Sequence, residues 1–282
     1  MEIGLALVSA VLFAVGSVLQ QKAGMNAPSE GTSSSLLLRM ARRPVWLVGI
    51  ALDGLGFVAQ AAALANGRLA VVQPLLVSSV VFALPCGVWL SGHHARRSDF
   101  AAAALVVVAL IAFVTIASPS GGRGEAPLRG WLMVGIACGV VCVPLALLGR
   151  RGTRPRRAAM FGTAAGVLFA LTAALTKAVV VSLDMGIVHV IGSWELYALA
   201  CVGYASMTFN QLALNTGALA PTVATSGASD PIASVVIGLT LFHESLHASA
   251  VRIGATIVAL TAALLGMVVL ARSEAQPPPD QT

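Results

Sequence analysis

Three ionisable side chains lie inside long apolar stretches of this sequence. Asp53 and Asp230 fall near the middle of two such stretches, and Lys177 falls toward the end of a third. In a membrane such a charge is costly unless it faces protein or a water-filled cavity, so each is a candidate functional residue. We expect the two carboxylates to bind a cation or a proton and Lys177 to balance their charge. The alternative for Asp53 is a structural ion pair or a hydrogen bond between helices.

The neighbours of Asp230 favour an irregular helix. Pro231 follows it, and Ser226-Gly227-Ala228-Ser229 precedes it. A proline frees a backbone carbonyl one turn back, and small hydroxyl residues can bond to such groups. We predict a broken or kinked helix whose carbonyls and carboxylate replace part of an ion's water shell. The alternative is that Asp230 caps a discontinuity or pairs with Lys177.

Neutral amides lie in or at the ends of neighbouring apolar stretches, at Gln60, Gln73, Asn210 and Gln211. We expect them to contact a solute. The alternative is that they join helices by hydrogen bonds, each worth about 0.6 kcal/mol.

A second chemistry is suggested by His243-Glu244-Ser245-Leu246-His247, an H-E-x-x-H pattern. On a helix its two histidines, His243 and His247, share a face and can bind zinc, with Glu244 as general base. The motif lies at the end of an apolar stretch, and Leu52-Asp53-Gly54, which resembles a third-ligand motif, lies far before it. An intramembrane zinc metalloprotease is therefore an alternative function.

The elements that must position these residues are predicted from composition. Of the 282 residues, 57% are hydrophobic and 10% are charged, whereas soluble domains are about 25% charged. This excludes soluble enzymes, nucleic-acid-binding proteins and disordered chains, despite the net charge of +6. We predict an all-α integral membrane protein whose main partner is the lipid bilayer.

A membrane-spanning helix needs about 20 mostly apolar residues. About nine stretches of the chain qualify: 3–22, 45–66, 69–91, 99–118, 130–149, 158–182, 194–215, 220–242 and 251–271. The pairs Gly135/Gly139 and Gly162/Gly166 are small-residue faces that we expect to pack helices together or to form a homodimer.

The basic residues predict the orientation of the chain. With the N-terminus outside and the C-terminus in the cytoplasm, 12 of the 17 Lys and Arg residues fall on the cytoplasmic side of a plasma (inner) membrane. Cytoplasmic loops carry such an excess. The twelve are Lys22, Arg39, Arg42, Arg43, Arg96, Arg97, Arg150, Arg151, Arg154, Arg156, Arg157 and Arg272.

An internal repeat relates the two halves of the chain. Val11–Ala14 recurs as Val167–Ala170, and the pattern of Gln60–Ala70 recurs in Asn210–Ala220. Five helices separate the equivalents, so the second copy is inverted in the membrane, which is typical of secondary transporters. We predict a first repeat over 1–118, a linking helix and basic loop over 119–157, an inverted second repeat over 158–273 and a disordered tail over 274–282.

Several short patterns resemble the drug/metabolite transporter (EamA-like) superfamily, most closely its NIPA-like magnesium-transporter branch. They are Val72-Gln73-Pro74-Leu75, Lys177, Gln211-x-x-Leu214-Asn215 and Leu241-Phe242-x-Glu244. The resemblance implies a small-solute or cation transporter. Where we expect that branch to carry an acid in the second helix, this chain has Phe57, and its nearest acid is Asp53.

The sequence thus predicts a secondary transporter, not an enzyme, that moves a small solute or a cation such as Mg²⁺ by alternating access around a midplane site. No phosphate-binding loop is present in the sequence, so ATP-driven transport is not expected. We expect no cofactor beyond a coupled cation or proton. A non-transporting scaffold or lipid-handling protein is the remaining alternative.

Overall fold

The computed structural model describes residues 1–25, 43–91, 97–117, 120–122, 126–245 and 250–274. The chain folds into a bundle of long helices: α1 (Glu2–Met25), α3 (Pro44–Asn66), α4 (Leu69–Leu76), α5 (Ser79–Ser91), α6 (Arg97–Ala117), α7 (Leu128–Gly149), α8 (Arg154–Val181), α10 (Trp194–Leu214), α11 (Leu219–Leu241) and α12 (Ala250–Glu274). The short elements are β1 (Ser120–Gly121), the 3₁₀ turn η1 (Ser182–Met185), α9 (Ile187–Gly192) and β2 (Glu244–Ser245).

The prediction of an all-α membrane protein is confirmed. All nine predicted stretches are helical, and in the described ranges seven spans are long and apolar enough to cross a membrane. These seven include α4 and α5 taken together as one span. α10 and α11 are as long but more polar, since α10 carries Asn210 and Gln211 and α11 carries Asp230. The total of nine crossings stays a prediction.

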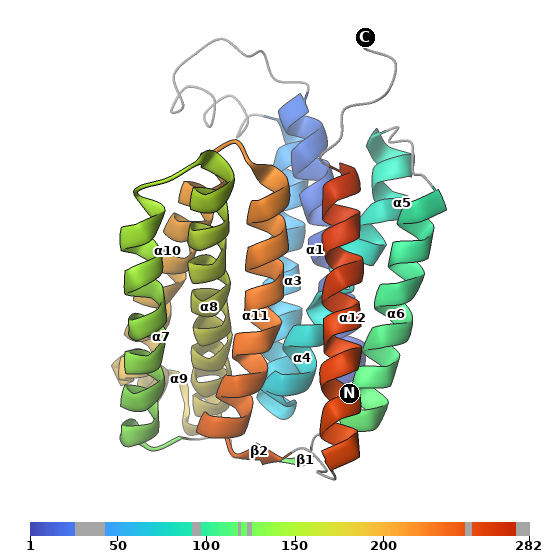
Figure 1. Ribbon diagram of the computed structural model, residues 1–282. Coiled ribbons are helices and arrows are strands. Elements are labelled where there is room, and N and C mark those ends of the chain that lie inside the picture. Colours follow the sequence, from blue (N-terminus) through green and yellow to red (C-terminus); the bar gives the residue numbers. More distant parts are fainter. Residues whose placement is uncertain (26–42, 92–96, 118–119, 123–125, 246–249, 275–282) are drawn as a thin grey trace.

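The long helices stand side by side and alternate in direction (Figure 1). We call the end where α1 begins and α3 meets α4 the N-terminal end, and the end where α7 meets α8, at Arg150–Arg157, the basic end. α1 runs away from the N-terminal end, whereas α8 runs toward it (Figure 1).

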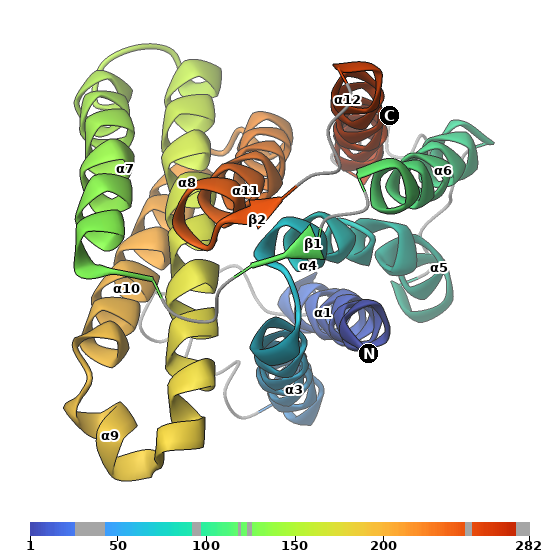
Figure 2. The same cartoon turned by 90° about the horizontal axis from the view of Figure 1, so that it is seen from below.

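Helix packing follows the same pattern in the two halves of the chain. α1 packs against α3, α4 and α5, and α8 packs against α10 and α11. α4 also packs against α11, and α6 packs against α12. Seen along the helices, α4 and α11 lie between a group formed by α7, α8 and α10 and the pair α6–α12 (Figure 2).

One predicted helix is interrupted, but it is not the one that carries Asp230. The stretch 69–91 breaks between α4 and α5 at Val77 and Ser78, where the backbone amides bond to the carbonyls of Pro74 and Leu75. The Ser78 hydroxyl adds a 2.6 Å bond to the Leu75 carbonyl.

The prediction of a break at Pro231 is wrong, because α11 is helical from Leu219 to Leu241 with Pro231 inside it, and the alternative of a kink there stays a prediction. Close packing against α8 supports the helix there. A Cβ on Gly162 would lie 2.9 Å from the Thr222 carbonyl oxygen, and one on Gly166 would lie 2.9 Å from the Asp230 backbone nitrogen. Gly162 and Gly166 therefore form a packing face, as predicted.

The predicted packing face formed by Gly135 and Gly139 contacts no other helix in the described part of the chain. A Cβ built on Gly135 or on Gly139 has no atom of the described chain within 4 Å.

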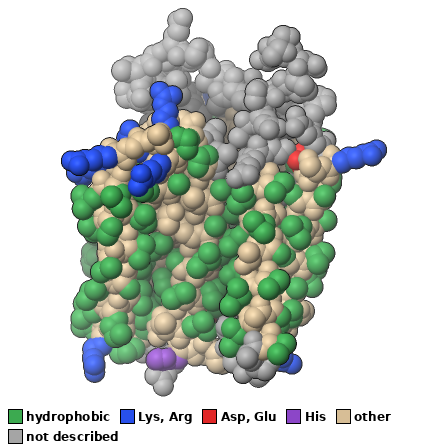
Figure 3. All heavy atoms as spheres, in the orientation of Figure 1, with side chains coloured by type: hydrophobic (Ala, Val, Ile, Leu, Met, Phe, Trp, Pro, Cys, Tyr) green, Lys and Arg blue, Asp and Glu red, His purple; other side chains and the backbone are tan. Residues whose placement is uncertain are grey.

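The exterior of the bundle is apolar. Met133, Val140 and Val258 are 71%, 66% and 68% exposed, which is expected of side chains that face lipid. Hydrophobic side chains cover the sides of the bundle, and Lys and Arg side chains gather toward its ends (Figure 3).

Candidate functional site

A buried ion pair joins α8 to the segment that follows α11. Lys177 Nζ lies 2.8 Å from Glu244 Oε1, and the two side chains are 6% and 0% exposed. A buried carboxylate needs further hydrogen bonds to offset its lost hydration. Glu244 Oε1 also accepts a 2.8 Å bond from the Leu69 amide, and Oε2 accepts a 2.9 Å bond from the Ala70 amide.

These amides belong to the first turn of α4, whose N–H groups have no partner within the helix. Glu244 therefore caps α4 and meets the positive end of its dipole. We call Lys177, Glu244 and the amides of Leu69 and Ala70 the α4 clasp. It ties two parts of the chain that are 174 residues apart.

The local sequence after α11 places Glu244. His243 has a φ of 51°, a left-handed conformation that turns the chain away from the helix. Glu244 then pairs with Gly121 in the short β1–β2 ladder. On α11, Gly238 leaves room, since a Cβ there would touch the Glu244 carboxylate and lie 3.2 Å from the Ala70 nitrogen.

An aromatic ring lies against the clasp, and two further rings pack in line with it. Lys177 Nζ lies 4.6 Å from the centre of the Phe242 ring, within the range of a cation–π contact. Trp131 packs edge-on against Phe242 at 6.0 Å and against Trp194 at 5.7 Å. The Phe242 ring thus covers Lys177, and because the ion pair is buried its attraction is stronger than it would be in water.

A second carboxylate, that of Glu2, binds the turn between α3 and α4 at the N-terminal end. Glu2 forms a salt bridge with Arg68, and its Oε2 accepts a 2.8 Å bond from the Arg68 backbone amide. The turn between α3 and α4 is thus fixed by Glu2 from α1 and by Glu244 from the second half of the chain.

Asp53 lies between α1 and α3. Its Oδ2 accepts a 2.6 Å hydrogen bond from Gln20 Nε2. A Cβ on Gly16 would touch the Asp53 carboxylate and lie 2.9 Å from the Gly49 carbonyl, so glycine at 16 lets the carboxylate fit between the helices. The bond to Gln20 is the interhelical alternative raised by the sequence.

Asp230 lies on α11 where the backbone of this helix packs against Gly166 of α8. Its Oδ1 accepts a 3.2 Å bond from the Ser234 hydroxyl, one turn later. Lys177 is paired with Glu244 and not with Asp230 or Asp53, so the expected charge balance is wrong for this structure. No hydrogen bond in the described ranges links Asp53, Asp230 and Lys177 to one another.

The predicted amides differ in their surroundings. Gln73, on α4, is 3% exposed, and its Nε2 has no hydrogen-bond partner among the described residues. Gln60 and Asn210 are half-buried, and Gln211 is exposed. Of these four amides, Gln73 is the one whose buried donor has no partner in the described part of the chain.

The structure does not place His243 and Glu244 as a helical zinc motif requires. α11 ends at Leu241, and Glu244 is in β2 with both of its oxygens already bonded. His247 lies outside the described residues. Within the described ranges there is no group of three His, Cys, Asp or Glu side chains that could hold a metal ion.

Sequence reasoning missed two contacts. The pairing of Lys177 with Glu244 had a signal, since both residues stand in largely apolar surroundings, but the sequence predicted Glu244 only as a zinc-site base and as part of the Leu241-Phe242-x-Glu244 pattern. Gln20, the partner of Asp53, was not singled out, because its position opposite Asp53 depends on how α1 packs on α3.

A protein of Corynebacterium glutamicum described as uncharacterized is 29% identical to this chain over 277 residues, which cover 96% of the chain and 95% of that relative. No protein-family model matches the chain. No solved structure matches it either.

Proposed function

We propose that the protein is a secondary transporter in which two inverted four-helix repeats rock around a polar site between them. The matched packing of α1 and α8, together with their opposite directions, supports the repeat. The observation that carries the proposal is the α4 clasp, because Glu244 of the second repeat binds backbone amides of the first.

The clasp would act as a gate at the N-terminal end. While Glu244 holds the Leu69 and Ala70 amides, that end is closed. Opening it separates α4 from Glu244 and exposes these amides to water, which can bond to them. Glu244 keeps Lys177 as its partner in both states, so no buried charge is left unpaired when the gate opens.

The interrupted helix supplies the second part of the site. α4 and α5 meet at Val77 and Ser78 beside α11, and such breaks are tolerated in a membrane where they line a cavity or are buried in protein. Gln73 offers a solute an amide nitrogen that has no hydrogen-bond partner among the described residues. Asp230 on α11 and Asp53 on α3 are the acidic groups that we assign to a coupled cation or proton.

The substrate is proposed to be a small solute or a cation, with Mg²⁺ as the first to test. The sequence resemblance to the drug/metabolite transporter superfamily and its NIPA-like branch supports this choice. The basic end, with Arg150–Arg157, would face the cytoplasm of a plasma (inner) membrane, which places the clasp on the outer side.

The test is flux into proteoliposomes that contain a Mg²⁺ indicator or a pH indicator. We expect the protein to move Mg²⁺ or protons and Asp230→Asn to reduce that flux at least tenfold. Asp184→Asn, which removes an exposed carboxylate on η1, is the matched control and should leave it unchanged. Equal flux in Asp230→Asn and the unsubstituted protein would contradict the assignment.

A further inference from the structure

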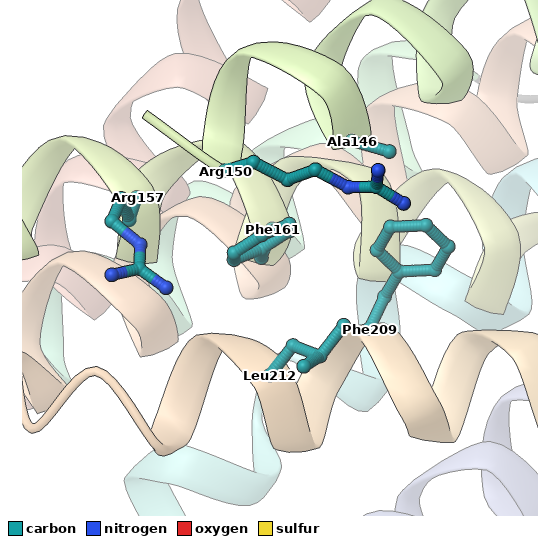
Figure 4. Close-up of a pocket in the computed structure, with 6 residues that line it drawn as sticks. All are labelled: Ala146, Arg150, Arg157, Phe161, Phe209 and Leu212. Carbon is teal, nitrogen blue, oxygen red and sulfur yellow. The ribbon is translucent and has the colours of Figure 1, made fainter. Parts of the chain in front are cut away.

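A cavity of about 380 Å³ lies at the basic end between α7, α8 and α10. It is lined by Ala146, Arg150, Arg157, Phe161, Phe209 and Leu212. Two guanidinium groups and two aromatic rings thus share one space (Figure 4). It lies far from the α4 clasp, which is at the opposite end of the bundle.

The aromatic part of the cavity is built by close helix packing. The rings of Phe161 and Phe209 lie 6.2 Å apart at an angle of 47°. Phe161 fits beneath the last turn of α7 because residue 149 is glycine, where a Cβ would lie 2.9 Å from the ring. The rings therefore form a fixed apolar floor.

No acidic side chain lines the charged part of the cavity. Arg157 donates from Nε to the Gly149 carbonyl at 3.2 Å, which ties the side chain to the end of α7. The Arg150 guanidinium makes no hydrogen bond to the described part of the chain, and the side chain extends toward Phe209 (Figure 4). The lining has no carboxylate, and the sequence has no Asp or Glu between Glu125 and Asp184.

The cavity borders the lipid-facing surface. Leu212, in its lining, is 43% exposed, and Leu147 and Leu148 on α7 are 57% and 53% exposed. A molecule that fills the space would have an anionic end near the two arginines and an apolar part beside the rings and Leu212. Arginine binds phosphate oxygens through two donors at once, and basic pockets between membrane helices bind lipid head groups.

We propose that this cavity is a binding site for an anionic phospholipid. Arg150 and Arg157 hold the head-group phosphate, and the first part of an acyl chain lies against Phe161, Phe209 and Leu212. A free phosphate ion shares the head-group chemistry but makes no use of the apolar floor.

The site is tested by native mass spectrometry of the purified full-length protein in detergent. Phosphatidylglycerol is titrated in, with phosphatidylcholine of the same chain length as the zwitterionic comparison. We expect Arg150→Gln to weaken phosphatidylglycerol binding at least tenfold. Arg151→Gln, which removes the same charge from an exposed residue outside the lining, should change it less than twofold.

The apolar floor is tested by Phe209→Ala and by competition with inorganic phosphate. We expect Phe209→Ala to weaken lipid binding severalfold and millimolar phosphate to displace little lipid. Each variant is first shown to unfold at the temperature of the unsubstituted protein.

Three results would overturn the proposal: equal losses in Arg150→Gln and Arg151→Gln, equal affinity for both lipids, or no loss in Arg150→Gln. Displacement of the lipid by phosphate together with unchanged binding in Phe209→Ala would overturn the lipid as occupant and leave a phosphate site.

Discussion

Glu244 Oε1 accepts hydrogen bonds from both Lys177 Nζ and the Leu69 amide, each at 2.8 Å, with its side chain fully buried. One carboxylate thus neutralises a buried lysine and caps a helix of the other half of the chain. Removing it affects the lysine, the helix and the contact between the halves together.

Glu244→Gln should destabilise the protein. The change leaves Lys177 as an uncompensated buried charge, which costs about 3–5 kcal/mol. Lys177→Met combined with Glu244→Gln should recover part of the loss, because no charge is then left buried. Denaturant-induced unfolding in detergent micelles measures both. A double variant less stable than Glu244→Gln alone would contradict the pairing.

Gly166→Val should disturb the packing of α8 on α11. The new side chain would press on the Asp230 backbone nitrogen, 2.9 Å from the Cβ position. Overpacking of this kind costs about 1–3 kcal/mol. Gly139→Val is the matched control, since nothing in the described chain lies within 4 Å of its Cβ position. Similar unfolding curves for the two variants would refute the packing role of Gly166.

The substitution Gln73→Leu tests whether the Gln73 amide, whose Nε2 has no partner among the described residues, serves stability or transport. A buried polar group without a partner costs about 1–3 kcal/mol, so an apolar replacement of similar size should keep or raise stability. Transport should nevertheless fall if the amide contacts the solute. Gln21→Leu, at an exposed position of α1, is the control. Normal flux in Gln73→Leu would remove the amide from the site.

The proposed orientation predicts which cysteines a membrane-impermeant maleimide can reach. In a variant without Cys86, Cys138, Cys142 and Cys201, a new cysteine at Asp184 should be labelled in intact cells. One at Arg151 should be labelled only after the cells are permeabilised. Both positions are exposed, at opposite ends of the bundle. The reverse pattern would place the N-terminus inside.

The helices were predictable because composition and length determine them. The start of α12 at Ala250 and the end of α6 at Ala117 lie within two residues of the predicted bounds. The packing role of Gly162 and Gly166 was also predictable, because small residues four apart lie on one face of a helix.

Contacts between helices were not predictable in the same way. The pattern His243-Glu244-x-x-His247 suggested a helix, but the left-handed His243 ends the helical path. Pro231 suggested a break that α11 does not have, and the break lies between α4 and α5. In both places a distant residue makes the contact that the local pattern does not show: Glu244 pairs with Lys177, and α11 packs on Gly166 beside Asp230.

Alternating access requires the N-terminal and basic ends to open in turn, and we propose that the α4 clasp closes the first. Spin-label distances by double electron–electron resonance test it directly. One pair of labels, at Ile3 and Asp184, spans the N-terminal end, and a second pair, at Gln21 and Arg151, spans the basic end. We predict that Glu244→Gln lengthens the first distance and shortens the second. Unchanged distances in both pairs, in a variant that remains folded, would contradict the role of the α4 clasp as a gate.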